Sequence, residues 1–385
     1  MKKSLLAVAV LGAFAGSAIA ADVTLYGVVD TGLVYTYSKV KEVGLDADKN
    51  NSFQMKGGNQ AGSRWGLKGT EDLGNGYSVG FILESGFDSD TGKGKSQLFN
   101  RQSTLSISGP FGTVLAGRMG SVNQGVSSAG KIGMVSAFGT SYGEYSTNAV
   151  SVFVPGQILP NMITYQSPKF AGVQIHAQYG MSADGDDGAV ENKARKTDRY
   201  VALAATYNNG PLNLYGAVDA TDYAHDKGEK HHTMSTYTLG GNYDFGVVKV
   251  FGAAQYFNEA DSDLFKGAYD EVFGGFFYET IRLKGWGVNL SASAPLGGGT
   301  LLAGVGYMDG KMAKSEKAEG FYSKQDVSRI RASIGYAYPF SKRTQVYAAA
   351  GFGKDESKWG FSGSSETYKD KVDYAVAMVG LRHNF

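Results

Sequence analysis

The chain has 385 residues, 42% of them apolar and 19% charged, and its 37 basic and 36 acidic side chains leave a formal charge of +1 at pH 7. This balance argues against the basic surface that nucleic acids require, so no nucleic-acid partner is expected. The absence of cysteine excludes disulfide scaffolds, thiol catalysis and cysteine-ligated zinc. Glycine is abundant at 55 residues, and the 24 tyrosines and 21 phenylalanines exclude a disordered low-complexity chain.

The N-terminal segment has the three parts of a secretory signal. Lys2 and Lys3 precede an apolar run from Leu5 to Ala15, and small residues at 18–20 form a cleavage site. We predict a cleaved signal peptide at residues 1–20 and one mature domain at residues 21–385. No later stretch reaches the roughly 18 consecutive apolar residues of a spanning helix.

After residue 21 the dominant pattern is a period of two, which is typical of β-strands because successive side chains point to opposite faces. Residues 173–179 show it most clearly, with one apolar and one polar face: Val173, Ile175, Ala177 and Tyr179 against Gln174, His176 and Gln178. The same split is found within residues 63–71, 326–338 and 374–385. Helix is therefore not expected over most of the chain.

Connections of two kinds separate these strands. Seven short turn clusters occur at residues 72–76, 109–112, 167–170, 208–211, 244–246, 295–299 and 339–343. Eight longer polar stretches lie near residues 38–62, 88–100, 119–160, 182–198, 224–232, 258–279, 309–325 and 354–371. Fifteen connections join sixteen strands of about 23 residues each, which suits a membrane-spanning strand and its connection. We predict an all-β fold, a 16-stranded antiparallel transmembrane β-barrel with long extracellular loops and short periplasmic turns.

Several segments carry a resemblance to a known family along the whole mature chain: Val23–Asp30, Ser63–Gly74, Gly109–Val114, Asn161–Pro168, Leu239–Gly246, Ser341–Thr344 and Val379–Phe385. In this order they resemble the general trimeric porins of beta-proteobacteria and Neisseria. The resemblance implies a homotrimer in the bacterial outer membrane that passes ions and small hydrophilic solutes through a water-filled pore. It implies no cofactor, metal ion or catalytic residue. The partners it implies are outer-membrane lipid, lipopolysaccharide and the barrel-assembly machinery, for which Phe385 resembles the recognition signal.

In this family a third loop folds into the pore and narrows it, and here it would span Met119 to Pro160. Arg64 matches the family's second-strand arginine, and Arg101 matches the arginine that opens the fourth strand. A third arginine of anion-selecting members aligns with Ile158, so strong anion selectivity is not expected.

Alternation adds further charges to the expected pore constriction. It directs Arg64, Lys68 and Arg118 inward, with Asp30 and Glu84 as inward acids, and the third loop adds Glu144. Strict alternation would point Arg101 outward, so Arg101 either lies above the membrane or is turned inward by a bulge. We predict Arg64, Arg101, Lys68, Arg118, Glu84 and Glu144 as constriction residues.

The alternative functions are an outer-membrane enzyme or a surface adhesin on the same barrel. The enzyme is disfavoured because the five histidines form no H-E-x-x-H motif and do not combine into a hydrolase constellation. An adhesin would use the eight long loops, and the sequence leaves that second role open.

Overall fold

The computed structural model describes residues 23–95, 97–125, 127–142, 151–181, 197–224, 232–261, 281–313 and 322–385. Within these residues the regular structure is β-strand apart from one 3-10 helix, η1 (Ile132–Val135). The strands are β1 (Thr24–Lys41), β2 (Asp48–Gly57), β3 (Arg64–Gly74), β4 (Tyr77–Gly86), β5 (Gln102–Gly109), β6 (Gly112–Gly120), β7 (Ile158–Gln166), β8 (Val173–Gly180), β9 (Arg199–Asn209), β10 (Leu212–Asp222), β11 (Thr233–Asp244), β12 (Lys249–Asp261), β13 (Arg282–Leu296), β14 (Gly299–Met312), β15 (Tyr322–Pro339), β16 (Thr344–Phe361) and β17 (Tyr368–Asn384). The predicted signal peptide at residues 1–20 lies outside the described residues.

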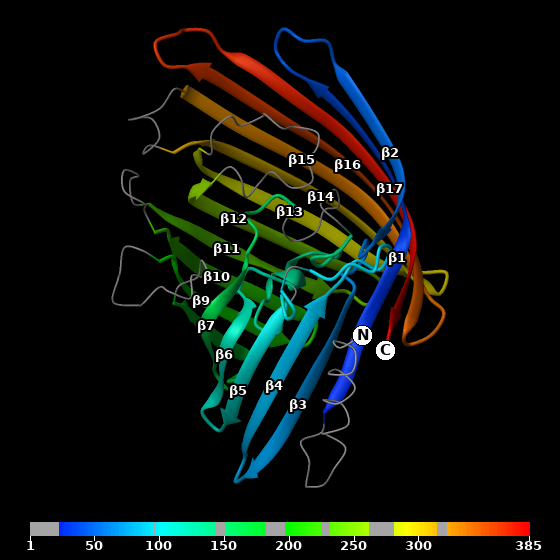
Figure 1. Ribbon diagram of the computed structural model, residues 1–385, viewed down its shortest axis with the longest axis vertical. Helices are drawn as coiled ribbons and strands as arrows, with labels where there is room; N and C mark the ends of the chain where they lie inside the picture. The colour runs from blue at the N-terminus through cyan, green and yellow to red at the C-terminus, as the bar shows by residue number, and fades with distance from the viewer. Residues whose placement is uncertain are drawn as a thin grey trace, which may run out of the picture.

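These strands close into an antiparallel barrel, and the first and last strands lie side by side in Figure 1. From β3 onward each strand pairs with the next along the chain, and β17 pairs with β1. β1 pairs on its other side with both β2 and β3, so the seventeen described segments fill sixteen positions. The predicted sixteen-stranded barrel is confirmed. Closing the ring pairs main-chain N–H and C=O groups within the sheet. This pairing is needed because the hydrocarbon of a membrane offers these groups no hydrogen-bond partners.

The chain end completes this closure. Phe385 and Gly27 exchange main-chain hydrogen bonds of 3.1 Å in both directions. The Phe385 ring covers Gly27 so closely that a Cβ on Gly27 would lie 2.3 Å from it. Gly27 is therefore a position where close approach of the final residue requires glycine.

The second position of the ring is divided between two strands. β2 pairs with β1 from Thr31 to Val40, β3 pairs with β1 from Thr24 to Val28, and residues 58–63 between them leave the ladder. The loops expected at 38–62 and 354–371 are therefore largely strand, since β1, β2, β16 and β17 extend into them. Above the membrane both faces of a strand are wet, so pairing continues without the apolar alternation on which the prediction depended.

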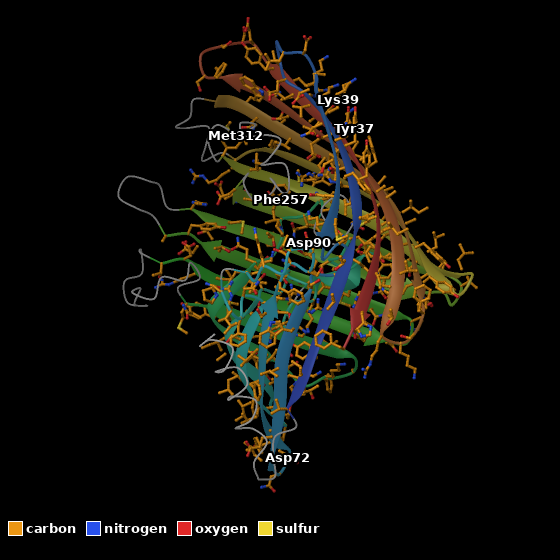
Figure 2. The ribbon with its side chains drawn as sticks, turned by 45° about the vertical axis from the view of Figure 1, so that its right-hand side comes forward. Tyr37, Lys39, Asp72, Asp90, Phe257 and Met312 are labelled. Carbon is orange, nitrogen blue, oxygen red and sulfur yellow. The ribbon has the colours of Figure 1, made fainter. Side chains whose placement is uncertain are left out.

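The short turns lie where the sequence predicts them. The connection between β3 and β4 consists of Asn75 and Gly76, whose φ angles of 53° and 79° are those of a type I′ hairpin. Figure 2 labels Asp72 beside this turn at one end of the barrel, far from Tyr37 and Lys39 toward the other end. The long connections join the strands at that other end, because antiparallel neighbours reverse direction.

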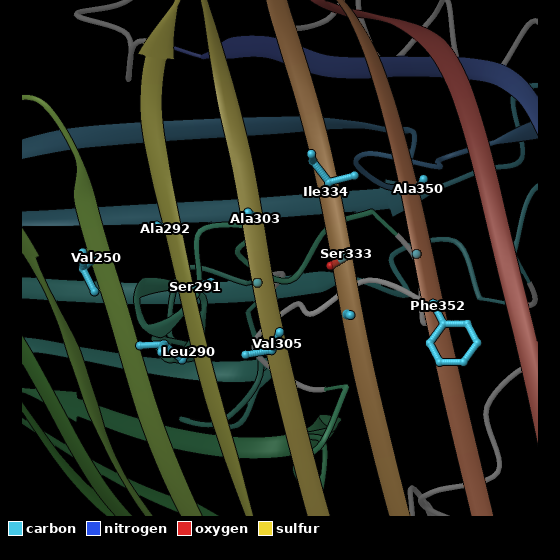
Figure 3. A pocket seen from close by; sticks show the side chains of 13 residues that line it. Val250, Leu290, Ser291, Ala292, Ala303, Val305, Ser333, Ile334, Ala350 and Phe352 are labelled. Atoms are coloured by element: carbon cyan, nitrogen blue, oxygen red, sulfur yellow. The ribbon is translucent and has the colours of Figure 1, made fainter.

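Alternation separates a lipid-facing surface from the lumen. On β17, Val379 and Leu381 are 47% and 50% exposed, whereas the preceding Met378 is 8% exposed. Figure 3 shows an outward hollow on β12–β16 that is lined by the larger Leu290, Val305 and Phe352 and by smaller alanine side chains. The outer surface is thus apolar and uneven. Among the described residues, no helix is both long and apolar enough to cross a membrane.

The connection between β6 and β7, residues 121–157, is called the third loop below. Figure 1 shows its first part running inside the ring of strands, where it forms η1. Of this loop the structure describes residues 121–125, 127–142 and 151–157.

Candidate functional site

A buried hydrogen-bond network fastens the start of the third loop to the wall of the barrel. Asn123 Nδ2 donates to Asp219 Oδ1 on β10 at 2.9 Å, and Tyr215 OH donates to Asn123 Oδ1 at 2.8 Å. Tyr200 and Thr236 also donate their hydroxyls to the Asp219 carboxylate. Asn123 and Asp219 are 1% and 6% exposed, so water cannot replace these bonds when one partner is removed.

Apolar packing holds two parts of the described loop against two sides of the barrel. Phe138 and Tyr142 pack with Val34 on β1, Tyr347 on β16 and Met378 on β17. Other loop residues are fully buried, among them Ile132, Val135, Val152 and Phe153. They belong to one cluster with Leu283, Met308 and Phe257, the last labelled in Figure 2. Burying a side chain of this kind contributes about 1.5–3 kcal/mol. The described parts of the loop therefore cross the lumen, from the β9–β14 side to β1, β16 and β17.

A compact charged cluster lies on the part of the wall formed by β1, β3 and β4. Arg101 Nε donates to Glu84 Oε1 at 2.7 Å, and Arg64 Nε lies 3.4 Å from Glu84 Oε2. Tyr26 OH donates to the same Oε2 at 3.0 Å. We call Arg64, Glu84 and Arg101 the constriction cluster, after the role that the sequence predicts for them; its two guanidiniums and one carboxylate leave a charge of +1. Glu84 is 7% exposed, so it depends on these charge-assisted bonds.

Arg101 reaches this cluster because it precedes the first residue of β5 and does not follow the alternation of that strand. β5 begins at Gln102, and Arg101 occupies a bend whose main-chain N–H donates to the Glu84 carbonyl at 3.3 Å. Its side chain passes over Gly86, where a Cβ would lie 3.2 Å from Arg101 Cδ. The bend before β5, together with the missing side chain of Gly86 on β4, thus turns Arg101 inward. Strict alternation predicts the opposite face.

The other predicted residues lie apart from the constriction cluster. Lys68 is on the inward face of β3, exposed, with Nζ 5.3 Å from the centre of the Tyr26 ring. Arg118 pairs with Ser103, which lies on the same face of β5 as the outward Leu105. Arg118 therefore faces outward, and its predicted inward placement is wrong. Glu144 lies outside the described residues.

The physical reason for the Arg118 error lies in the parity of β6. Leu115 and Met119 are both buried on the inward face, so alternation places Arg118 with the exposed Ala116 on the outward face. Arg118 Nε donates to the Asn100 carbonyl at 3.0 Å. The register with β7 shifts between Gly117, whose φ is 128°, and Met119, but this shift leaves the parity of β6 unchanged.

Sequence reasoning missed three contributors to this wall. Tyr26 lies on the inward parity of β1, which could have indicated its contact with Glu84. Arg382 pairs with Asp30 across β17 and β1, and its inward parity could also have been read from alternation. Residues 58–63 gave no signal, because they fall within an expected loop.

This arrangement can bias the passage of ions. Fixed charges on a low-dielectric wall focus their field into a narrow aqueous path, and arginine remains charged throughout the accessible pH range. A net positive cluster raises the local concentration of small anions. Glu84 partly cancels that field and orients both guanidiniums.

Comparison with known proteins shows the family of the chain. Residues 7–358 match the family model described as Gram-negative porin. An outer membrane porin protein of Bordetella pertussis is 33% identical, and outer membrane porin protein 32 of Delftia acidovorans is 30% identical. Both alignments cover 100% of this chain and 100% of the relative.

Solved structures share the fold. An anion-selective porin from Comamonas acidovorans is 25% identical with a TM-score of 0.65, covering 95% of this chain and 100% of that one. OmpT, an outer membrane protein of Vibrio cholerae described in a trimer form, has a TM-score of 0.55 at 14% identity, covering 95% and 100%.

Proposed function

This chain belongs to the Gram-negative porin family and forms a general diffusion channel of the outer membrane, and we propose that Arg64 and Arg101 give the channel a weak preference for small anions. The observation that supports this preference is the constriction cluster, in which Glu84 pairs with both guanidiniums and leaves one positive charge. The anion-selective porin of Comamonas is similar over most of this chain. Ile158 begins β7 without adding a charge, so the preference is expected to be weak.

Single-channel recording tests this proposal. Purified protein in a planar bilayer should give stable conductance steps, and a salt gradient should produce a small reversal potential of the sign that marks anion preference. A potential of the opposite sign would contradict the role of the arginines. Folded protein without conductance would contradict the open channel and favour the enzyme or adhesin alternative.

We further propose a homotrimer. The support is the resemblance to trimeric porins and the trimer form described for OmpT. We expect the channels of one insertion event to close in three steps. We also expect cross-linking to give a species with the mass of three chains. A cross-linked mass of one chain would contradict the trimer.

We propose that lipopolysaccharide contacts the outer rim of β16 and β17. Phe352 is the last apolar outward residue of β16, and Lys354 follows two residues later beside the apolar Ile330. Lys354, Lys369 and Lys371 lie 3.2, 2.8 and 3.5 Å from the Glu356 carboxylate, so three cations surround one anion just above the apolar band. Neighbouring β1 and β2 add outward Lys39, Lys41 and Lys49. Rows of lysine just above the apolar band of a barrel can bind the phosphate groups of lipids.

Replacing Lys354, Lys369 and Lys371 by glutamine should lower the lipopolysaccharide retained per purified barrel by about half or more, because each lysine near an anionic surface contributes about 1 kcal/mol. The matched control replaces Lys342 and Arg343 in a periplasmic turn, which also removes cations but lies at the opposite end. Equal retention in both variants would contradict the lipid contact.

A further inference from the structure

Residues 58–63, between β2 and β3, fold inside the barrel, and we call them the inner turn. The inner turn lies beside inward-facing groups from separate strands. Gln345 Nε2 on β16 donates to Gln60 Oε1 at 2.6 Å, and Asn59 and Gln60 are only 6% and 5% exposed. The turn is therefore packed against the wall and is not a free surface loop.

Asp30 on β1 holds the inner turn by its carboxylate. Asp30 Oδ2 accepts the main-chain N–H groups of Gln60 at 2.8 Å and Ala61 at 2.6 Å. Its other oxygen, Oδ1, accepts the hydroxyl of Tyr347 at 2.6 Å. Asp30 is 0% exposed, so these donors replace the water that its charge would otherwise require.

The main chain of Asp30 belongs to the same arrangement. Its N–H donates to Ser63 Oγ at 3.0 Å, and its carbonyl accepts the N–H of Gly58 at 2.8 Å and the hydroxyl of Ser89 at 2.6 Å. Irregular backbone at membrane depth persists only where its polar groups find partners inside the protein. Asp30 thus satisfies both ends of the inner turn.

The inner turn in turn contacts the third loop. Gln60 Nε2 donates to Tyr142 OH at 2.6 Å, and the Tyr142 N–H donates to the Gln60 carbonyl at 3.2 Å. Asn123, near the start of the third loop, is bonded to Asp219 on β10. The third loop is therefore tied to the wall through Asp219 near its start and to the inner turn at Tyr142.

The inner turn also contacts the constriction cluster. The Gly62 carbonyl accepts a hydrogen bond from Arg64 Nη1 at 2.9 Å, and a Cβ on Gly62 would lie 3.2 Å from Arg101 Nη1. One short segment therefore touches both the arginine wall and the loop opposite it, and its position influences the width between them.

We propose that the inner turn is a second element of the pore constriction and that Asp30 is the positioning residue that sets how far the turn reaches into the lumen. This inference rests on the proposed channel function. Without the Asp30 carboxylate the turn retracts, Tyr142 loses its hydrogen bonds to Gln60, and the Gly62 carbonyl no longer orients Arg64. The passage then widens, and the third loop moves more freely at Tyr142.

The first test compares Asp30→Ala with Asp30→Asn in planar bilayers. Asp30→Ala should raise single-channel conductance by about 1.5-fold or more and increase open-channel current noise, because pore width and loop motion both change. Asp30→Asn keeps a carbonyl oxygen that can accept the Gln60 and Ala61 N–H groups, so it should restore most of the normal conductance. Conductance and noise of Asp30→Ala equal to those of the unchanged protein would overturn the proposal.

A second variant covers the case in which Asp30→Ala does not fold. Tyr142→Phe removes the hydroxyl that accepts from Gln60 Nε2, and it leaves the Asp30 hydrogen bonds and the Gln345–Gln60 bond intact. It should raise current noise while the heat stability of the barrel stays unchanged. Normal noise would overturn the proposal. If the unchanged protein conducts and all variants match it, only this inference fails, whereas no conductance in the unchanged protein rejects the proposed function itself.

Discussion

Replacing Arg64 and Arg101 together by serine is expected to move the ion preference of the channel toward cations. The change removes both guanidiniums that lie against Glu84, so the net charge of the constriction cluster goes from +1 to −1. An ion passing at about 7 Å in water feels about 0.6 kcal/mol from each charge, and screening by about 0.1 M salt reduces this to about 0.3 kcal/mol. Because anions and cations shift in opposite directions, the permeability ratio changes roughly threefold per charge removed. The anion-to-cation permeability ratio should therefore fall by about three- to tenfold. The reversal potential across a gradient of about 0.1 M salt, where screening is moderate, measures it.

Two controls separate the constriction cluster from the overall charge of the protein. Lys342→Ser with Arg343→Ser removes the same formal charge from an exposed periplasmic turn and should leave the reversal potential unchanged. Adding Glu84→Gln to the double arginine variant should bring the preference back toward neutral, because the remaining carboxylate is the source of cation attraction. A reversal potential that stays the same in the double arginine variant would reject the role of the two arginines.

Deleting Phe385 is expected to reduce the amount of assembled barrel in the outer membrane by about tenfold, while the channels that do assemble conduct normally. The deletion removes the hydrogen bonds that Phe385 exchanges with Gly27, each contributing about 0.5–1.5 kcal/mol, and it uncovers Gly27. It also removes the outward aromatic ring, 44% exposed, that we propose the assembly machinery recognises. Heat-modifiable mobility on gels measures the folded fraction.

A substitution separates closure from recognition. Phe385→Ala keeps the main-chain bonds to Gly27 and loses only the ring. If the ring is the recognition signal, this variant should assemble poorly in cells and still fold into lipid vesicles that contain no assembly machinery. Normal yield of the deletion variant in cells would contradict both roles of Phe385.

The sequence by itself determined the barrel, because a strand between lipid and water must alternate apolar and polar side chains. That requirement is local, and it can be read from Val379 and Leu381 against Met378 without knowing the fold. The short turns follow similarly, since Asn75 and Gly76 are residues that accept positive φ. The inward placement of Arg64 and Glu84 came from the same rule.

Only the tertiary structure decided where alternation fails. Arg101 turns inward because a bend and the missing side chain of Gly86 allow it. Arg118 lies in the outward row with Ala116, which its pairing with Ser103 shows. The inner turn gave no local signal, because its partners Asp30, Tyr142 and Gln345 are up to 285 residues away along the chain. Such contacts depend on closure of the barrel, which brings distant strands together, and a periodic pattern along the chain carries no information about them.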